Sequence, residues 1–316
     1  MMQTVPLGAS ELISTRLAYG CWRLAGTWNP AEKRAEDEER GRAAVIAAYE
    51  AGYRLFDNAN IYCRGHAERI FGEALQQVPE MRGNIIIATK CGIRFPGDPE
   101  PGSPHRYDFS ARHIVRACED SLKRMKIETI DLYQLHRPDY LADPAEVAEA
   151  FEKLQKSGKV RYFGVSNFRP TLLTALAAAC PMPLIVHQLE ISLARLDAFT
   201  DGALDQCLTE KITPLAWSPL ARGLLGDGGR NVPPALQSVY NPEKIVPVLD
   251  AIATERGLGR IVVALAWLLK HPAKIIPIVG STNPEHIHHA AQAANVELTR
   301  EEWYRLLYAS RGTPLP

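Results

Sequence analysis

Short runs of apolar and β-branched residues recur along the chain, and each is followed by a segment whose apolar residues lie three and four positions apart. Alternation of this kind predicts repeated βα units around a parallel sheet. Polar residues stand at the end of the apolar runs, where a strand would pass into a loop. Eight strands are predicted, at residues 17–22, 54–60, 85–90, 131–136, 162–167, 184–190, 214–219 and 274–280.

The helical segments between these runs carry start and stop signals. Residues 111–125 follow Ser110, a good N-cap, and residues 143–158 begin with Asp-Pro and end with Gly. After residue 240 the pattern predicts further helices, the last of them beyond the final strand. No linker interrupts this order, so we expect an α/β fold in which residues 1–316 form a single (β/α)8 TIM barrel domain with additional C-terminal helices.

A barrel gathers the residues at the carboxyl ends of its strands around one active site. A doubly wound sheet is the alternative fold, but its nucleotide-binding form should show G-x-G-x-x-G after the first strand, and that fingerprint is missing. The polar residues at predicted strand ends are Asp57, Lys90, His136, Asn167, Gln188, Glu190, Ser218 and Ser281.

Two long stretches rich in Gly and Pro follow strand ends, at residues 91–109 and 221–240. Loops of this length usually carry function. The second contains GDGG at residues 226–229, which lacks the GK[ST] ending of a P-loop and favours a mobile lid over a cofactor.

Composition narrows the choice of partners. The 316 residues carry 36 Lys and Arg against 36 Asp and Glu, so the basic surface of a nucleic-acid or anionic-membrane binder is not expected. Neither a signal peptide nor an apolar run of about 18 residues is present, which favours a cytoplasmic protein. Six cysteines without a C-x-x-C pair favour reduced thiols. The histidines at 286, 288 and 289 lack ligands at metal spacing, so no metal site is predicted.

Four ionisable residues at or near predicted strand ends suit proton-coupled hydride transfer. A buried Lys90 ammonium beside the Tyr62 phenol would lower the tyrosine pKa from about 10, so that the hydroxyl works as a general acid or base. Asp57 would keep Lys90 charged and oriented, and His136 could donate a hydrogen bond to a carbonyl oxygen. A Schiff-base lyase is an alternative, because Lys90 could itself attack a carbonyl.

Five motifs in order resemble those of the aldo-keto reductase family, over nearly the whole chain. The chain is most similar to bacterial members with GxWRL near the start, here at residues 20–24, and with HRPD after the fourth strand. The five motifs are FDNANIY at 56–62, ATKCG at 88–92, LYQLHRPD at 132–139, GVSNF at 164–168 and AWSPLARGLLG at 216–226.

The resemblance implies a catalytic tetrad with Tyr62 as proton donor, Lys90 and Asp57 tuning it, and His136 orienting the substrate carbonyl. It also implies NADP(H) as cofactor, with the Trp217 ring stacked on the nicotinamide. Ser166, Asn167 and Gln188 would bind the nicotinamide carboxamide, and Ser218, Leu220, Arg222 and Gly223 would contact the pyrophosphate. The remaining cofactor-binding residues implied are Gly20, Cys21, Trp22, Gly280, Ser281, Thr282 and His286.

Two departures from the family pattern bear on the cofactor and the site. Gly280 and His286 occupy the positions at which many members place a lysine and an arginine to grip the 2′-phosphate. Ser281, Thr282 and Asn283 can still donate hydrogen bonds at a helix start, so NADP is expected, with NAD possible. Asn60 stands where an acidic residue is common.

The function expected is NADPH-dependent reduction of an aldehyde or ketone, a small-molecule carbonyl substrate, to an alcohol. Besides the Lys90 lyase, the alternative is a non-catalytic NADP-binding module that reports redox state to a partner. Arg94 and Arg137 hint at an acidic or phosphorylated group on the substrate.

Overall fold

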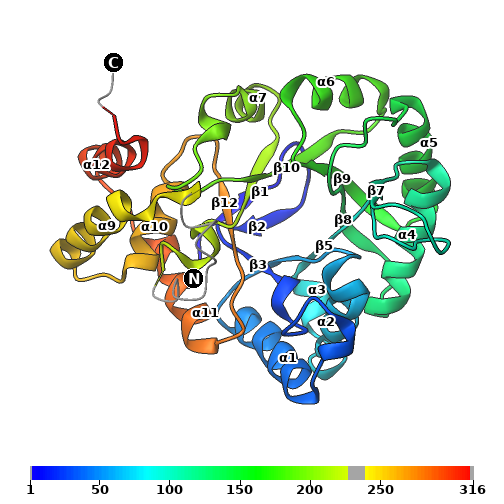
Figure 1. Cartoon of the computed structure of the whole chain (residues 1–316), viewed down its shortest axis with the longest axis horizontal. Coiled ribbons are helices and arrows are strands. Elements are labelled where there is room, and N and C mark those ends of the chain that lie inside the picture. The colour runs from blue at the N-terminus through cyan, green and yellow to red at the C-terminus, as the bar shows by residue number, and fades with distance from the viewer. Residues whose placement is uncertain (1, 227–238, 314–316) are drawn as a thin grey trace.

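Eight parallel strands close into a barrel at the centre of the computed structural model, which describes residues 2–226 and 239–313 (Figure 1). Neighbouring strands follow one another in chain order, and the last pairs with the first. All eight predicted strands and the (β/α)8 fold are thereby confirmed. The strands are β3 (Ala18–Gly20), β4 (Leu55–Asp57), β5 (Ile86–Cys91), β8 (Ile130–Leu135), β9 (Val160–Ser166), β10 (Leu184–Glu190), β11 (Thr213–Trp217) and β12 (Ile276–Val279).

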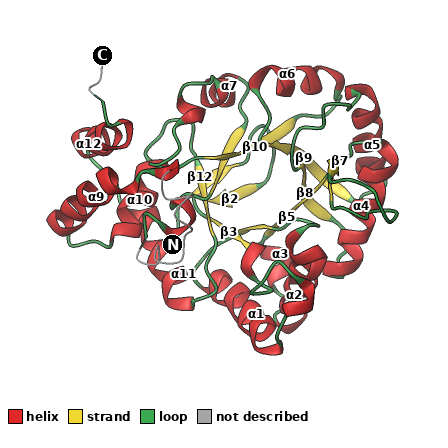
Figure 2. Cartoon of the chain, in the orientation of Figure 1, coloured by secondary structure: helices red, strands yellow, loops and turns green. Residues whose placement is uncertain are grey.

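Helices surround the barrel as an outer ring, which Figure 2 shows in red around the yellow strands. The expected N-caps are present, because the Ser110 side chain accepts a hydrogen bond from the His113 N–H and that of Asp143 accepts one from the Ala145 N–H. The α-helices are α1 (Ala35–Glu50), α2 (His66–Gln77), α3 (Met81–Asn84), α4 (Ala111–Met125), α5 (Pro144–Lys156), α6 (Pro170–Ala179), α7 (Ala203–Thr209), α9 (Pro242–Arg256), α10 (Arg260–Leu269), α11 (Pro284–Ala291) and α12 (Arg300–Arg311). Short 3-10 helices are η1 (Cys21–Arg23), η2 (Pro30–Glu32), η3 (Tyr62–Gly65), η4 (Asp197–Phe199), η5 (Ala221–Gly223) and η7 (Gln292–Asn295).

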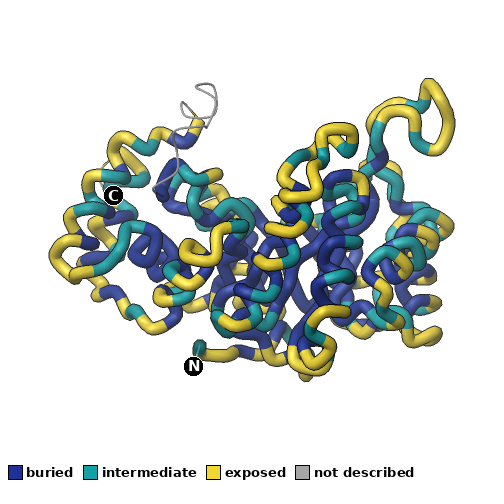
Figure 3. The backbone as a smooth tube through the Cα atoms, turned by 90° about the horizontal axis from the view of Figure 1, so that it is seen from below, coloured by how far each residue is buried: buried dark blue, intermediate teal, exposed yellow. Residues whose placement is uncertain are grey.

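The barrel interior is filled by apolar side chains and closed at one end by a hairpin that sequence analysis did not predict. Strands β1 (Thr4–Pro6) and β2 (Ile13–Thr15) pair antiparallel, and Leu7 and Leu12 beside them pack among interior residues such as Leu55. The Gly8 N–H donates to the hydroxyl of Thr213, at the start of β11. The amino-terminal end of the barrel is therefore sealed, and Figure 3 shows the buried residues gathered at the centre.

The additional C-terminal helices form a second packed layer at the edge of the barrel, where Figure 1 shows α9 and α12. Trp267 of α10 and Trp303 of α12 stack with ring centroids 5.0 Å apart. Each indole N–H also donates to the backbone carbonyl of the other tryptophan, at 3.1 and 3.0 Å. The start of α12 is fixed by a capping box between Thr299 and Glu302.

The two long loops differ from the irregular stretches that the sequence suggested. Within 91–109, strands β6 (Ile93–Arg94) and β7 (Arg106–Tyr107) form a short hairpin. Most of the 221–240 loop, including three of the four GDGG residues, lies outside the described residues. In the part of the chain that the structure describes, no helix is long and apolar enough to cross a membrane.

Gly72 on α2 tests how closely the outer helices pack. A Cβ at this position would lie 2.4 Å from the backbone oxygen of Met125, at the end of α4. We expect Gly72→Ala to lower the unfolding free energy by about 2 kcal/mol, because two helices must separate. The midpoint of chemical denaturation measures this change. Gly83→Ala is the control, because its Cβ would meet nothing within 4 Å; equal midpoints for the two variants would contradict the packing argument.

Candidate active site

Strand alternation explains why the predicted site residues face the barrel interior. Side chains two positions apart share one face of a strand. On β5, Ile86 and Ala88 belong to the interior cluster, so the next interior position is Lys90. On β8, Leu132 is an interior residue, which directs Gln134 to the interior and puts His136 just past the strand end.

The Lys90 ammonium is the centre of the site. Its side chain has no solvent exposure, and Nζ lies 2.7 Å from Asp57 Oδ2, 2.8 Å from the Asn58 carbonyl oxygen and 3.1 Å from the Tyr62 hydroxyl. Three acceptors therefore use its three N–H bonds. Burial alone would lower the pKa of Lys90, but the Asp57 carboxylate and the Tyr62 hydroxyl raise it above its ordinary value. Lys90 is a charged ammonium at neutral pH.

Asp57, only 3% exposed, is held by more than the lysine. Its second oxygen, Oδ1, accepts hydrogen bonds from the amide nitrogens of Gln188 at 2.9 Å and Gln134 at 3.5 Å. Gln134 was not among the sequence candidates. Its position in the sequence could have identified it, because Gln134 stands two residues before His136 and therefore on the same face of the strand.

The pKa of Tyr62 differs from the sequence expectation. We expected Lys90 to lower it, but burial of the phenol raises it above its ordinary value, and Lys90 offsets only part of that effect. The main physical reason is that burial disfavours the charged phenolate, and the Asp57 carboxylate, bonded to the same ammonium, raises the pKa of Tyr62 further. Tyr62 is therefore a protonated phenol at neutral pH, which is the form that can donate a proton.

Tyr62 reaches this position through an unusual turn. It begins η3, and the next residues, Cys63 and Arg64, have left-handed backbone dihedrals with φ of 45° and 51°. Non-glycine residues in this region cost of order 1 kcal/mol or more each. The chain thus accepts local strain between β4 and α2, where it presents Tyr62 to Lys90.

His136 lies beside Tyr62, with ring centroids 6.0 Å apart and the rings nearly perpendicular. The side chain is buried, and its Nδ1 has no hydrogen-bond partner among the described residues. Burial, followed by the charges of Lys90 and Arg137, holds the pKa of His136 well below its ordinary value. The ring is therefore a neutral imidazole, with one N–H to donate.

Three of the predicted cofactor residues bond to one another at the ends of β9 and β11. The Asn167 amide nitrogen donates to the Ser166 hydroxyl at 2.6 Å and to the His136 carbonyl at 3.3 Å. The Trp217 indole N–H donates to the Asn167 side-chain oxygen at 2.9 Å. Trp217 is partly exposed and fixed in orientation. Gln188, which was also predicted to bind the nicotinamide carboxamide, instead donates a hydrogen bond from its amide nitrogen to Asp57.

The segments around residues 20–22 and 280–282 lie together. A Cβ on Gly280 would come within 3.0 Å of the Trp22 indole nitrogen, and the Tyr19 hydroxyl donates to the Ser281 carbonyl at 2.8 Å. Within this group Cys21 is fully buried, whereas Trp22, Gly280, Ser281 and Thr282 are partly exposed. His286 is exposed on the first turns of α11, next to Glu285.

The turn after β11 carries Ser218, Leu220, Arg222 and Gly223. Ser218 and Arg222 have positive φ angles of 50° and 58°, so the backbone folds tightly around this segment. Arg222 Nε donates to the Tyr240 hydroxyl at 3.3 Å, and that hydroxyl in turn donates to Glu190 at the end of β10. Tyr240 was not a sequence candidate, and nothing in its local pattern marks it.

Trp28, which was not a sequence candidate, lies against Tyr62. Trp28 is 48% exposed, yet its ring lies 6.0 Å from that of Tyr62 and 5.6 Å from that of Trp22.

Of the two arginines expected to meet an anionic group of the substrate, Arg94 is bound to Asp98 and Asp108 by ion pairs of 2.7 and 2.8 Å.

Arg137 is different. It lies half-buried with its guanidinium carbon 5.3 Å from the Trp217 ring centroid, and no ion pair to it is found within residues 2–226 and 239–313. Of the two arginines Arg94 and Arg137, the second is therefore the one placed to meet a ligand beside His136.

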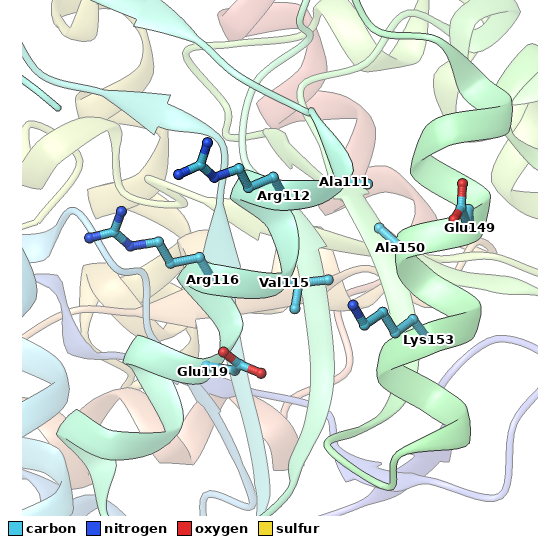
Figure 4. Close-up of a pocket in the computed structure, with 8 residues that line it drawn as sticks. All are labelled: Ala111, Arg112, Val115, Arg116, Glu119, Glu149, Ala150 and Lys153. Carbon is cyan, nitrogen blue, oxygen red and sulfur yellow. The ribbon is translucent and has the colours of Figure 1, made fainter.

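A surface groove of about 390 Å³ lies elsewhere, between α4 and α5 (Figure 4). It contains none of the residues Asp57, Tyr62, Lys90 and His136, which we call the tetrad. Among the residues that the structure describes, no cluster of three or more His, Cys, Asp or Glu side chains could hold a metal ion. The groove is lined by Ala111, Arg112, Val115, Arg116, Glu119, Glu149, Ala150 and Lys153.

Comparisons with known proteins agree with this architecture. The chain is 39% identical over 316 residues to the 6-dehydroglucose reductase of Novosphingobium aromaticivorans, covering 98% of this chain and 96% of that protein. It is 37% identical to the 6-dehydroglucose reductase of Agrobacterium fabrum, covering 98% and 99%. The holo form of an aldo-keto reductase from Bacillus halodurans matches with a TM-score of 0.80 and 26% identity, over 98% of this chain and 96% of that one.

An oxidoreductase on a (β/α)8 barrel is the class of protein that the fold and these relatives define. The family model for the aldo/keto reductase family matches residues 16–309, and the chain belongs to that family. Its general chemistry is carbonyl reduction.

The neutral state of His136 can be tested by NMR. Because burial and the Lys90 charge disfavour the imidazolium, we expect its ring signals to stay constant between about pH 8 and pH 6. Histidine-labelled protein gives these signals, and their loss in His136→Gln assigns them. A titration midpoint near 6.5 would show that the ring carries a charge in this environment as readily as in water.

Proposed function

We propose that this chain reduces an aldehyde or ketone to an alcohol with NADPH, and that Tyr62 donates the proton. The observation that carries the proposal is the Lys90 ammonium, bonded at once to the Asp57 carboxylate and the Tyr62 hydroxyl. Such a cluster keeps the phenol next to a fixed positive charge, which stabilises the phenolate formed when Tyr62 gives up its proton. The family match from residue 16 to 309 supports treating the chain as one domain.

The residues present fit a nicotinamide cofactor, which members of this family generally use. Ser166 and Asn167 offer hydroxyl and amide groups suited to a carboxamide, and Trp217 offers an aromatic face held in place by a hydrogen bond. Arg222, exposed beside the turn after β11, suits a pyrophosphate. When bound, the cofactor supplies the hydride for the reduction.

The preference for NADPH rests on the start of α11. Ser281 and Thr282 are partly exposed there, and a helix start favours an anion. Glu285 in the first turn opposes that effect, and the lysine and arginine expected from the family pattern are replaced by Gly280 and His286. Gly280 lies against the Trp22 indole, where a longer side chain would have to displace the ring.

The tetrad has distinct roles in the proposed reaction. His136, as a neutral imidazole, donates a hydrogen bond to the substrate carbonyl oxygen and orients it toward Tyr62. Tyr62 gives its proton to this oxygen as negative charge develops there. Lys90 stabilises the phenolate that remains, and Asp57, fixed by Gln188, keeps Lys90 in place.

The alternatives are less well supported. A Schiff-base lyase needs a neutral amine as nucleophile, whereas the pKa of Lys90 is raised and its three N–H bonds are used. A non-catalytic module has no need for the complete tetrad. The relatives named 6-dehydroglucose reductase support a sugar-derived aldehyde as substrate, and the half-buried Arg137 could donate hydrogen bonds to its hydroxyls.

Tyr62→Phe tests the proton donor. The substitution removes one oxygen atom, so we expect kcat to fall about 100-fold or more while the Kd for NADPH changes little. Loss of NADPH absorbance with a panel of aldehydes measures turnover. Tyr308→Phe, on an exposed part of α12, is the matched control and should keep full activity. A Tyr62→Phe enzyme that retains normal turnover would exclude Tyr62 as the donor.

Fluorescence titration tests the cofactor site and its selectivity. Because Trp217 is expected to lie against the nicotinamide, NADPH should quench tryptophan emission, and most of this quenching should disappear in Trp217→Phe. We expect NADPH to bind about 10-fold more tightly than NADH, through the 2′-phosphate at the start of α11. Equal affinities would instead assign dual or NAD use to this chain.

A further inference from the structure

Trp28 is a large exposed side chain in contact with Tyr62, and it has no role in the reaction proposed for the tetrad. Its ring meets the Tyr62 ring edge-on at 6.0 Å and an angle of 87°, and it also contacts Trp22. Despite these contacts, the residue is 48% exposed to solvent. The indole thus combines a face open to solvent with direct contact to Tyr62, the proposed proton donor, so a ligand bound at the tetrad can cover it.

The loop that carries Trp28, residues 26–33, contains several hydrogen bonds between its own residues. The Asn29 side chain accepts a hydrogen bond from the Ala31 N–H at 3.1 Å and donates one to Glu32 at 2.9 Å. Thr27 bonds to the same glutamate and to the Asn29 N–H. Gly26, with a φ of 72°, lies so close to Asp37 that a Cβ there would clash at 2.7 Å.

The loop is also attached to the segment that presents Tyr62. Lys33 Nζ lies 2.9 Å from His66 Nδ1, and His66 is the first residue of α2, directly after η3. The indole and the phenol are therefore linked through the Lys33–His66 side-chain contact as well as by the contact between their rings. A rigid aromatic face contributes binding energy at low entropic cost.

We propose that Trp28 is a specificity-determining residue that stacks on the C–H face of a cyclic, polyhydroxylated aldehyde, such as a sugar oxidised at an exocyclic carbon. The proposal rests on the carbonyl reduction proposed above. A ring next to the reacting carbonyl would reach past Tyr62 to the indole, while Arg137, which follows His136, donates to its hydroxyls. A short acyclic aldehyde reaches the tetrad without touching Trp28.

Steady-state kinetics of the full chain with NADPH tests this assignment. The two substrates are 6-dehydroglucose, which has a ring, and propanal, which has none. For Trp28→Ala we expect the KM for 6-dehydroglucose to rise about 10-fold, with kcat changed by less than about threefold and propanal reduced as by the wild type. Trp28→Phe keeps an aromatic face and should recover part of the lost affinity. Tyr304→Ala, an exposed aromatic residue of α12, is the control.

The possible failures are distinguishable. If Trp28→Ala and Trp28→Phe leave the ratio of kcat/KM for the two substrates unchanged, or lower both values equally, Trp28 does not select the substrate. If the wild type binds NADPH but reduces neither aldehyde nor any other carbonyl compound, the proposed function itself is wrong. Should Trp28→Ala fail to fold, Trp28→Phe decides, since a selective rise in its KM supports the assignment and an unchanged ratio overturns it.

Discussion

A charged ammonium without solvent exposure is the constraint on which the rest of the site depends. Leaving the Lys90 charge unpaired in the barrel would cost several kcal/mol, so the surrounding residues must supply acceptors. Asp57 supplies the countercharge, the Asn58 carbonyl and Tyr62 supply the other two acceptors, and Gln188 occupies the free oxygen of Asp57. Because each partner fixes the next, the phenol is held in place before any substrate arrives.

The turns that carry the site residues after the barrel strands have strained backbone conformations. Packing in the rest of the fold holds these turns in place. Cys63, Asn167, Ser218 and Arg222 all have positive φ angles, and each lies in a turn that follows a barrel strand. Strain of order 1 kcal/mol or more at each position persists only where the surroundings hold it. That support comes from the apolar barrel interior, sealed by the β1–β2 hairpin, and from the helices packed outside.

The sequence predicted the barrel because its strands and helices have local signals that agree with one another. Polar residues at the ends of the predicted strands were also expected to gather at one end of the barrel, and Asp57 does bond to both Lys90 and Gln188. The β1–β2 hairpin was not predicted, because strands of three residues are too short to show an alternation of apolar and polar positions. The pKa direction of Tyr62 was wrong because it depends on desolvation, and Trp28 was missed because its contact with Tyr62 joins separate loops.

The charges of the tetrad explain why Tyr62, rather than Lys90, is the proposed acid. At rest the ammonium and the Asp57 carboxylate cancel, and the phenol and the imidazole are neutral. If Lys90 gave up a proton, Asp57 would be left as a buried carboxylate without a countercharge. If Tyr62 gives up its proton, the new negative charge lies beside the ammonium, at the 3.1 Å contact. Tyr62 is also partly exposed, so it can be reprotonated from solvent while Lys90 stays buried and charged.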